Sequence, residues 1–218
     1  MRPPKGIGDG RARAMWAGIV GPVLFVSIFA IEGRLRVGYD SRAMYISALS
    51  LGPRGWVQIL NFVIFGLLLL AFARGVAAGA PSRLGPALLT IVAIGNLLLG
   101  LLVMDPVGAF GNGMSFHGAV HHIVARIVLL LMPVSCFMFV RRFRREPKWR
   151  SLEWCTLAAG TTIAIAVAIL AIATTVVSAR NAFAPWLGLI RRVAVVPYMA
   201  WLFIFALTFL SDSTIRPQ

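Results

Sequence analysis

A chain of 218 residues in which 59% are hydrophobic and 13% are charged does not have the composition of a soluble globular domain. Its formal net charge of +14 is spread in short clusters between long apolar runs, which is typical of a membrane protein rather than a nucleic-acid-binding one. We therefore expect an integral membrane protein that has membrane lipids as partners and binds no nucleic acid.

Six apolar runs are long enough to cross a bilayer, which takes about 20 residues of helix. The predicted helices span approximately Met15–Ile31, Trp56–Phe72, Leu84–Met104, Phe116–Val140, Leu152–Val177 and Trp186–Leu210. The predicted fold class is all-α, an integral membrane bundle of six transmembrane helices. We assign residues 14–210 to this domain, residues 1–13 to a disordered basic cytoplasmic N-terminus and residues 211–218 to a cytoplasmic tail.

Two pairs of glycines lie inside the first and third predicted helices, namely Gly18 with Gly21 and Gly95 with Gly100. Small residues let the backbones of membrane helices approach closely. We expect these glycines to serve helix packing rather than a ligand-binding loop.

The distribution of basic residues predicts the orientation of the bundle. The N-terminus, the 73–83 loop, the 141–150 loop and the tail carry 13 of the 21 Lys and Arg residues, and the loops on the opposite side carry seven. The positive-inside rule then places both termini in the cytoplasm. The 33–55, 105–116 and 178–191 loops would face outward.

One outward segment, residues 105–122, holds all three histidines of the chain and contains no Lys or Arg. His117 and His121 are four residues apart, so on a helix they would share a face. The glycine-rich loop before them can fold Asp105 back towards these imidazoles, and Ser115 is placed to cap the start of the helix. This end of the bundle is the candidate site.

Two imidazoles and a carboxylate are common zinc ligands, so one hypothesis is a metal site formed by His117, His121 and Asp105. Zinc held there would activate a water molecule for hydrolysis. The alternative is that the histidines form hydrogen bonds with the loop and with lipid headgroups.

Arg126 is the charge expected deepest in the membrane, about 15 Å from the start of the fourth helix by helical rise. A charged side chain at that depth is expected to face the bundle interior and a partner. Both a structural ion pair and a contact with a substrate anion are open. The polar side chains considered as partners are Glu32, Asp40, Asn61, Asn96 and Asp105.

Short motifs in all three outward loops resemble one family. They are Asp40 followed by Ile46-Ser47-Ala48-Leu49, then Asp105-Pro106 followed by His117-Gly118-Ala119-Val120-His121, and finally Gly188-Leu189-Ile190-Arg191-Arg192. In this order the motifs resemble the bacterial and archaeal membrane family catalogued as domain of unknown function 998, over about residues 15–210. A Phe-Pro pair usual in the second motif of that family is Leu102-Val103 here.

The resemblance implies a six-helix protein of the bacterial inner membrane and no established activity. It also groups six residues on the outer face, Asp40, Ser47, Asp105, His117, His121 and Arg192. Together with Arg126, these are the predicted ligand-binding residues.

Three functional hypotheses remain. The first is a polar pocket in the outer leaflet that binds a lipid or a small amphiphile without catalysis. The second is an intramembrane metal-dependent hydrolase that uses the His-x-x-x-His pair with an Asp. The third is a small transporter or a transporter accessory subunit. The sequence leaves open whether the chain is an enzyme and whether it forms homo-oligomers.

Overall fold

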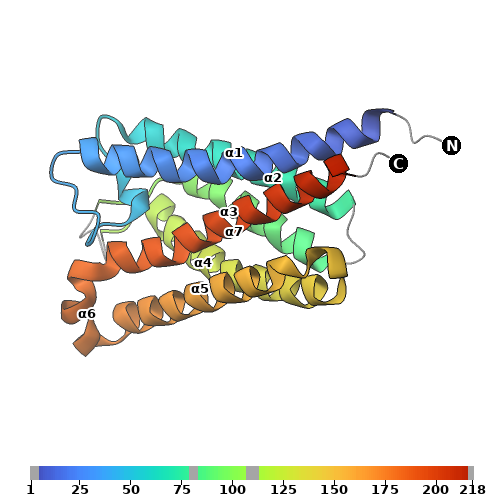
Figure 1. Cartoon of the computed structure of the whole chain (residues 1–218). Helices are drawn as coiled ribbons and strands as arrows, with labels where there is room; N and C mark the ends of the chain where they lie inside the picture. The colour runs from blue at the N-terminus through green and yellow to red at the C-terminus, as the bar shows by residue number, and fades with distance from the viewer. Residues whose placement is uncertain (1–4, 79–82, 107–112, 216–218) are drawn as a thin grey trace.

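A computed structural model of the chain describes residues 5–78, 83–106 and 113–215, and within these residues all regular structure is helical (Figure 1). The long helices are α1 (Lys5–Leu35), α2 (Gly55–Ala78), α3 (Leu84–Leu101), α4 (Phe116–Arg145), α5 (Ser151–Thr175) and α7 (Leu187–Ile215). The short ones are η1 (Ile46–Ser50), η2 (Pro147–Trp149), α6 (Val177–Phe183) and η3 (Ala184–Trp186).

Among the described residues, the six long helices are long and apolar enough to cross a membrane. This confirms the predicted fold class, an all-α bundle with six membrane-spanning helices. The chain is therefore a multi-pass membrane protein.

The ends of several helices differ from the prediction. The first helix begins at Lys5, so residues 5–13 are helical where we expected disorder, and α7 continues to Ile215, past the predicted end at Leu210. Hydropathy marks only where the apolar run ends, and the backbone hydrogen bonds of a helix can continue beyond that point. The predicted 178–191 loop likewise contains α6 and η3. Residues 1–4 and 216–218 lie outside the described part of the chain.

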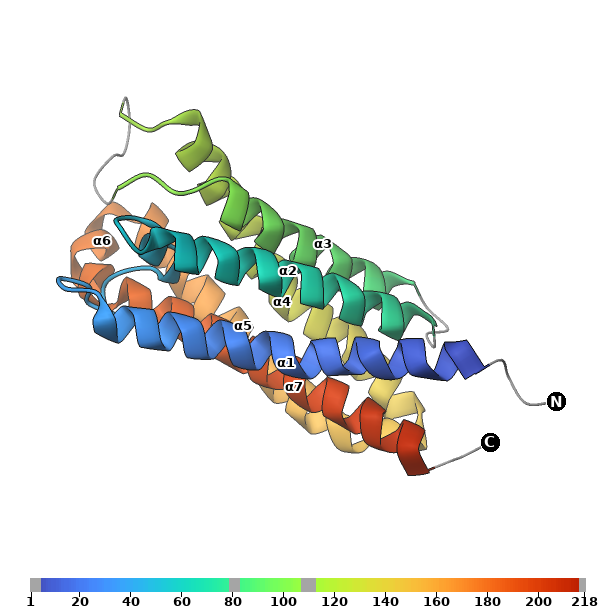
Figure 2. The same ribbon diagram turned by 90° about the horizontal axis from the view of Figure 1, so that it is seen from above.

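The long helices form a closed ring. Each packs against the next in the order α1, α2, α3, α4, α5 and α7, and α7 returns to pack against α1 (Figures 1 and 2). Both termini lie at one end of the ring, which we call the termini end. The opposite end carries η1 and α6 and is called the η1 end.

Close packing around the ring depends on small residues. A Cβ atom added at Gly18 would lie 2.4 Å from Phe72 of α2, and one added at Gly95 would lie 2.3 Å from Val128 of α4. Added Cβ atoms would also come within 2.8 Å of a neighbouring helix at Gly100 and 3.2 Å at Gly21. The prediction that these glycines permit helix packing is confirmed.

Aromatic side chains fill the inside of the ring towards the termini end. The ring of Phe205 lies 4.9 Å from that of Phe139 and 5.1 Å from that of Phe143, and Trp149 stacks on Phe209 at 4.2 Å. The termini end of the interior is therefore occupied by protein atoms.

The η1 helix covers the other mouth of the ring. All five of its residues are buried, and it packs against α1, α2 and α7. Two arginines fix η1 and the loop around it. Arg54, which follows η1, forms an ion pair with Glu32 of α1, and Arg36 donates to the carbonyl oxygen of Ala48 in η1. Beneath η1 lies the candidate site.

Candidate functional site

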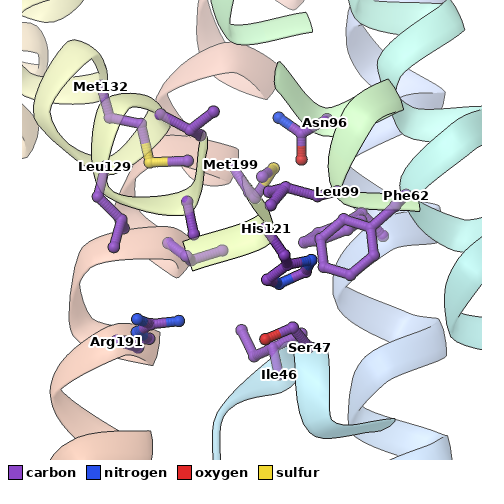
Figure 3. Close-up of a pocket in the computed structure, with 14 residues that line it drawn as sticks. Ile46, Ser47, Phe62, Asn96, Leu99, His121, Leu129, Met132, Arg191 and Met199 are labelled. Atoms are coloured by element: carbon purple, nitrogen blue, oxygen red, sulfur yellow. The ribbon is translucent and has the colours of Figure 1, made fainter. Parts of the chain in front are cut away.

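A pocket lies inside the ring directly beneath η1, with η1 and every long helix except α5 contributing side chains (Figure 3). Its cavity volume is about 50 Å³, within about 500 Å³ of space that protein atoms leave unfilled and that is partly open to the outside. The lining is mainly apolar and includes four polar residues. The lining residues are Phe25, Ile46, Ser47, Phe62, Asn96, Leu99, His121, Ala125, Val128, Leu129, Met132, Arg191, Val195 and Met199.

His121 is the most deeply buried of the ionisable residues that line the pocket, with 1% of its surface exposed. Its Nδ1 atom lies 2.6 Å from the carbonyl oxygen of Leu102, which is left without a helical partner because α3 ends at Leu101. A carbonyl only accepts hydrogen bonds, so Nδ1 carries the hydrogen and Nε2 of the neutral ring presents a lone pair. Nε2 is buried and has no hydrogen-bond partner in the described part of the protein. The pocket therefore offers an unused acceptor.

Asp105 and Ser115 fix where α4 begins and thereby where His121 lies. Ser115 accepts a hydrogen bond from the backbone N–H of Gly118 at 3.0 Å, as predicted for a helix cap. The Asp105 carboxylate accepts from both the N–H and the hydroxyl of Ser115, each at 2.7 Å. These two hydrogen bonds lower the pKa of Asp105 below its usual value. Asp105 does not line the pocket.

Arg191 enters the pocket from α7. Its guanidinium carbon lies 3.8 Å from the centre of the Tyr45 ring, and its Nε atom is buried without a hydrogen-bond partner among the described residues. No ion pair joins it to a carboxylate of the described chain. The sequence prediction selected the neighbouring Arg192 and missed Arg191. Its spacing from Val195 and Met199, four and eight residues along α7, is the signal that places it on the inward stripe.

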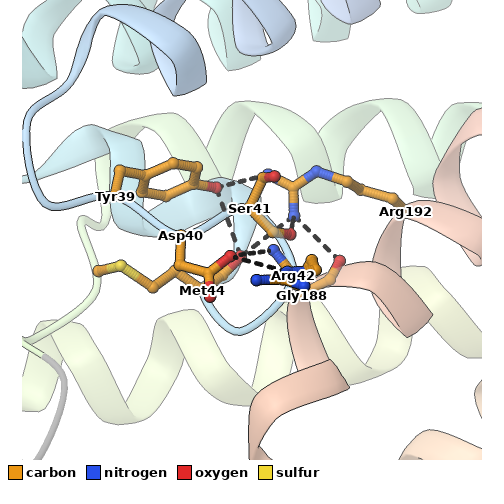
Figure 4. A network of polar contacts seen from close by, with 7 residues as sticks. All are labelled: Tyr39, Asp40, Ser41, Arg42, Met44, Gly188 and Arg192. Carbon is orange, nitrogen blue, oxygen red and sulfur yellow. Dashed lines mark hydrogen bonds and ion pairs between the residues drawn. The ribbon is translucent and has the colours of Figure 1, made fainter.

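Arg192 has a structural role at the mouth of the ring (Figure 4). It donates hydrogen bonds to the backbone oxygens of Ser41 (2.5 Å), Met44 (3.1 Å) and Gly188 (3.0 Å) and to the hydroxyl of Tyr39 (2.6 Å). Burial raises the pKa of Tyr39, whose hydroxyl donates in turn to the carbonyl oxygen of Tyr45. We call this network the Arg192 latch.

Gly188 allows the close packing on which the Arg192 latch depends. A Cβ atom at this position would lie 2.3 Å from the backbone oxygen of Met44, so the first turn of α7 rests directly against the loop before η1. In the same loop, Asp40 accepts from the backbone N–H of Arg42 at 2.9 Å. Asp40 and Arg192 thus shape the loop and do not line the pocket.

The model of a family described as "Protein of unknown function (DUF998)" matches residues 19–208. The chain belongs to the DUF998 family. Comparisons with curated proteins and with solved structures gave no match. The family match confirms the resemblance that was based on the three loop motifs.

Within this DUF998 chain, the motif residues fall into two groups. Ser47 and His121 line the pocket, and the Ser47 hydroxyl donates to the Met104 sulfur at 3.2 Å. Asp40, Asp105 and Arg192 hold the surrounding backbone instead. Residues of these motifs thus form part of the pocket and also support it.

Two predicted site residues lie elsewhere in the DUF998 fold. His117 is exposed in the first turn of α4, although it is four residues from the buried His121. Arg126 is exposed as well, so the prediction that it faces the bundle interior is wrong. The inward stripe of α4 runs through His121, Ala125 and Val128, and Arg126 lies about 100° around the helix from Ala125.

The described residues of this DUF998 protein contain no group of three or more His, Cys, Asp or Glu side chains arranged to hold a metal ion. His121 uses Nδ1 for the Leu102 carbonyl, whereas His117 is exposed. The zinc hypothesis for His117, His121 and Asp105 stays an untested prediction with no support from this geometry.

Proposed function

We propose that this protein binds a small amphiphile, such as a single-chain lipid, in the pocket beneath η1. The observation that carries the proposal is the buried Nε2 atom of His121, which faces a mainly apolar pocket without a hydrogen-bond partner among the described residues. A ligand that donates a hydrogen bond to this atom and buries a hydrocarbon chain against the lining would complete the site.

Physical chemistry supports an amphiphile over a purely apolar or purely polar ligand. A buried acceptor left unsatisfied costs about 1–3 kcal/mol, and a hydroxyl group would recover much of that. Side chains such as Leu99, Leu129 and Val195 would solvate an alkyl chain, with a gain of about 25 cal/mol per Å² of apolar surface buried. Most ligand pockets combine an apolar lining with a few placed polar groups in this way.

The polar groups also give the pocket a direction. His121, Arg191 and Ser47 gather beside η1, as Figure 3 shows, whereas Asn96 and Met132 lie on the far side of the pocket. The Asn96 amide already donates to the carbonyl oxygen of Val92. The headgroup of the ligand would sit beside η1 and its chain would extend towards the middle of the bundle.

The proposal includes the orientation predicted from charge. With both termini in the cytoplasm, the η1 end faces outward and the pocket lies in the outer leaflet of the bacterial inner membrane. All pocket residues come from one chain, so binding does not require the homo-oligomer that the sequence leaves open. No specific observation favours a hydrolase or a transporter over a binding protein.

The test compares two probes that share an oleoyl chain, namely methyl oleate, which has no hydrogen-bond donor, and monooleoylglycerol, which has two hydroxyls. Binding to the purified protein in neutral-detergent micelles would be measured by native mass spectrometry. We expect monooleoylglycerol to bind roughly tenfold more tightly, because a hydrogen bond to a buried acceptor contributes about 1–2 kcal/mol.

Three variants make this test specific. His121→Leu should remove the preference for monooleoylglycerol, and Ala125→Phe should weaken both probes by filling the pocket. His117→Leu, a change in an exposed histidine of the same helix, should alter neither. Thermal unfolding would confirm that each variant is folded. Equal binding of both probes to the wild type and to all three variants would refute the proposal.

A further inference from the structure

We infer that the amphiphile carries an anionic oxygen group, which Arg191 binds inside the pocket and Arg126 attracts at its edge. The inference rests on the proposed function and names the class of ligand. The headgroup would combine an anionic oxygen for Arg191 with a hydroxyl for His121, as in a lysophospholipid with a phosphate monoester.

Arg191 is placed to receive an anion. Arg191 is half-buried, and burying part of a guanidinium group without a counter-charge is unfavourable. The contact with the Tyr45 ring at 3.8 Å compensates for only part of the lost hydration. The same contact fixes the plane of the guanidinium, so its Nε–H is preorganised for an oxygen ligand.

A second positive charge lies nearby. Arg126 of α4 repels Arg191 of α7 electrostatically, and both cations act on His122 of α4. Arg126 is exposed, and its long side chain can reach towards the headgroup region of the membrane. An anion bound near both arginines would relieve their repulsion.

The acidic side chains that the structure describes do not supply that anion. Five acidic side chains have described contacts, and each is engaged with another group. They are Glu32 with Arg54, Asp40 with Arg42, Asp105 with Ser115, Glu146 with Arg142, and Glu153 with Arg144. None of the described carboxylates is therefore available to Arg191, and we infer that a ligand supplies the negative charge.

The hydrogen-bonding groups of the pocket further restrict the class of ligand. Arg191 donates, whereas Nε2 of His121 accepts, so one headgroup must offer both an acceptor and a donor. A glycerol phosphate with a free hydroxyl meets both requirements, while its acyl chain meets the apolar lining. A diacylglycerol phosphate would lack the glycerol hydroxyl.

The decisive comparison uses monooleoylglycerol and oleoyl lysophosphatidate, which differ by one phosphate. Glycerol 3-phosphate, which has the headgroup without the chain, separates a lipid from a soluble anion. Each probe would be titrated into wild-type protein, Arg191→Gln, Arg126→Gln and the control Arg34→Gln, which changes an exposed arginine of α1. Binding would be measured by native mass spectrometry at fixed ionic strength.

We expect lysophosphatidate to bind the wild type at least tenfold more tightly than monooleoylglycerol, since a hydrogen bond between charged groups is stronger than one between neutral groups. Arg191→Gln should abolish that preference. Arg126→Gln should reduce the preference by a few-fold, and Arg34→Gln should preserve it.

Two results would overturn the inference while leaving the proposed function standing. One is equal binding of lysophosphatidate and monooleoylglycerol to the wild type, and the other is a preference that survives Arg191→Gln. Glycerol 3-phosphate binding as tightly as lysophosphatidate would show a soluble-anion site and overturn both. Failure of all three probes to bind would refute the proposed function and the inference with it.

Discussion

At the scale of single residues, Asp105 controls the geometry of the site without touching the pocket. Its carboxylate accepts two hydrogen bonds from Ser115, the residue that caps α4. A group whose pKa is lowered by folding stabilises the folded state above its unfolded pKa, and that contribution is lost as the pH falls through the folded pKa.

The expected consequence is a pH-dependent effect of Asp105→Asn. At pH 7 the variant should unfold at a lower temperature than the wild type, because the amide accepts more weakly from Ser115. The difference should shrink as the pH falls below about 4, the ordinary value for Asp. Thermal unfolding in detergent between pH 3 and 7 would measure it, and a difference that is constant across this range would contradict the assignment.

The sequence predicted part of the site because it marks residue types and spacing. His121 and Ser47 were predicted from loop motifs and line the pocket. Arg191 was missed because it adjoins Arg192, and only the phase of α7 decides which of the two faces inward. Arg126 was misplaced for a related reason, since depth in a helix does not fix the side on which a residue lies.

At the scale of elements, the Arg192 latch joins α7 to the loop that leads into η1. One side chain contacts three backbone oxygens and the Tyr39 hydroxyl, and thereby holds the cover of the pocket. The sequence contained no local signal for η1 or for this latch, because residues 41 and 192 meet only through the closure of the ring.

Arg192→Gln should loosen this cover. We expect faster hydrogen exchange across residues 39–51, with a loss of about 1–3 kcal/mol of protection, because the shorter amide reaches fewer of the four acceptors. Hydrogen exchange with mass spectrometry would measure it, with Arg42→Gln as a control in the same loop. Unchanged exchange in residues 39–51 of the Arg192 variant would exclude the latch as the anchor of η1.

At the scale of the whole molecule, six apolar runs predicted six helices, and their closure into a ring creates the internal pocket. Hydropathy was sufficient for the number of helices because each run must satisfy its backbone hydrogen bonds within itself in the bilayer. Which helices become neighbours depends on how their side chains pack, for example at the glycines. Hydropathy along a single sequence carries no information on that packing.

The proposed orientation predicts which end is accessible from outside the cell. Val37 is 98% exposed in the loop at the η1 end, whereas Ala78 is exposed at the end of α2 near the termini. In a variant with Cys136 and Cys155 replaced by Ala, Val37→Cys should react with a membrane-impermeant maleimide in intact spheroplasts. Ala78→Cys should react only after permeabilisation. The reverse labelling pattern would show that the termini end faces outward and would contradict the proposed orientation.

The central claim is that an amphiphile occupies the pocket beneath η1, and photo-crosslinking tests it most directly. A monooleoylglycerol analogue with a diazirine in its acyl chain would be activated on the purified protein, and the labelled residues identified by mass spectrometry. We predict labels on pocket residues such as Leu129, Met132 and Met199 that unlabelled monooleoylglycerol competes away. Labels confined to the exposed lipid-facing residues Ile123, Ile127 and Leu130 would contradict the claim.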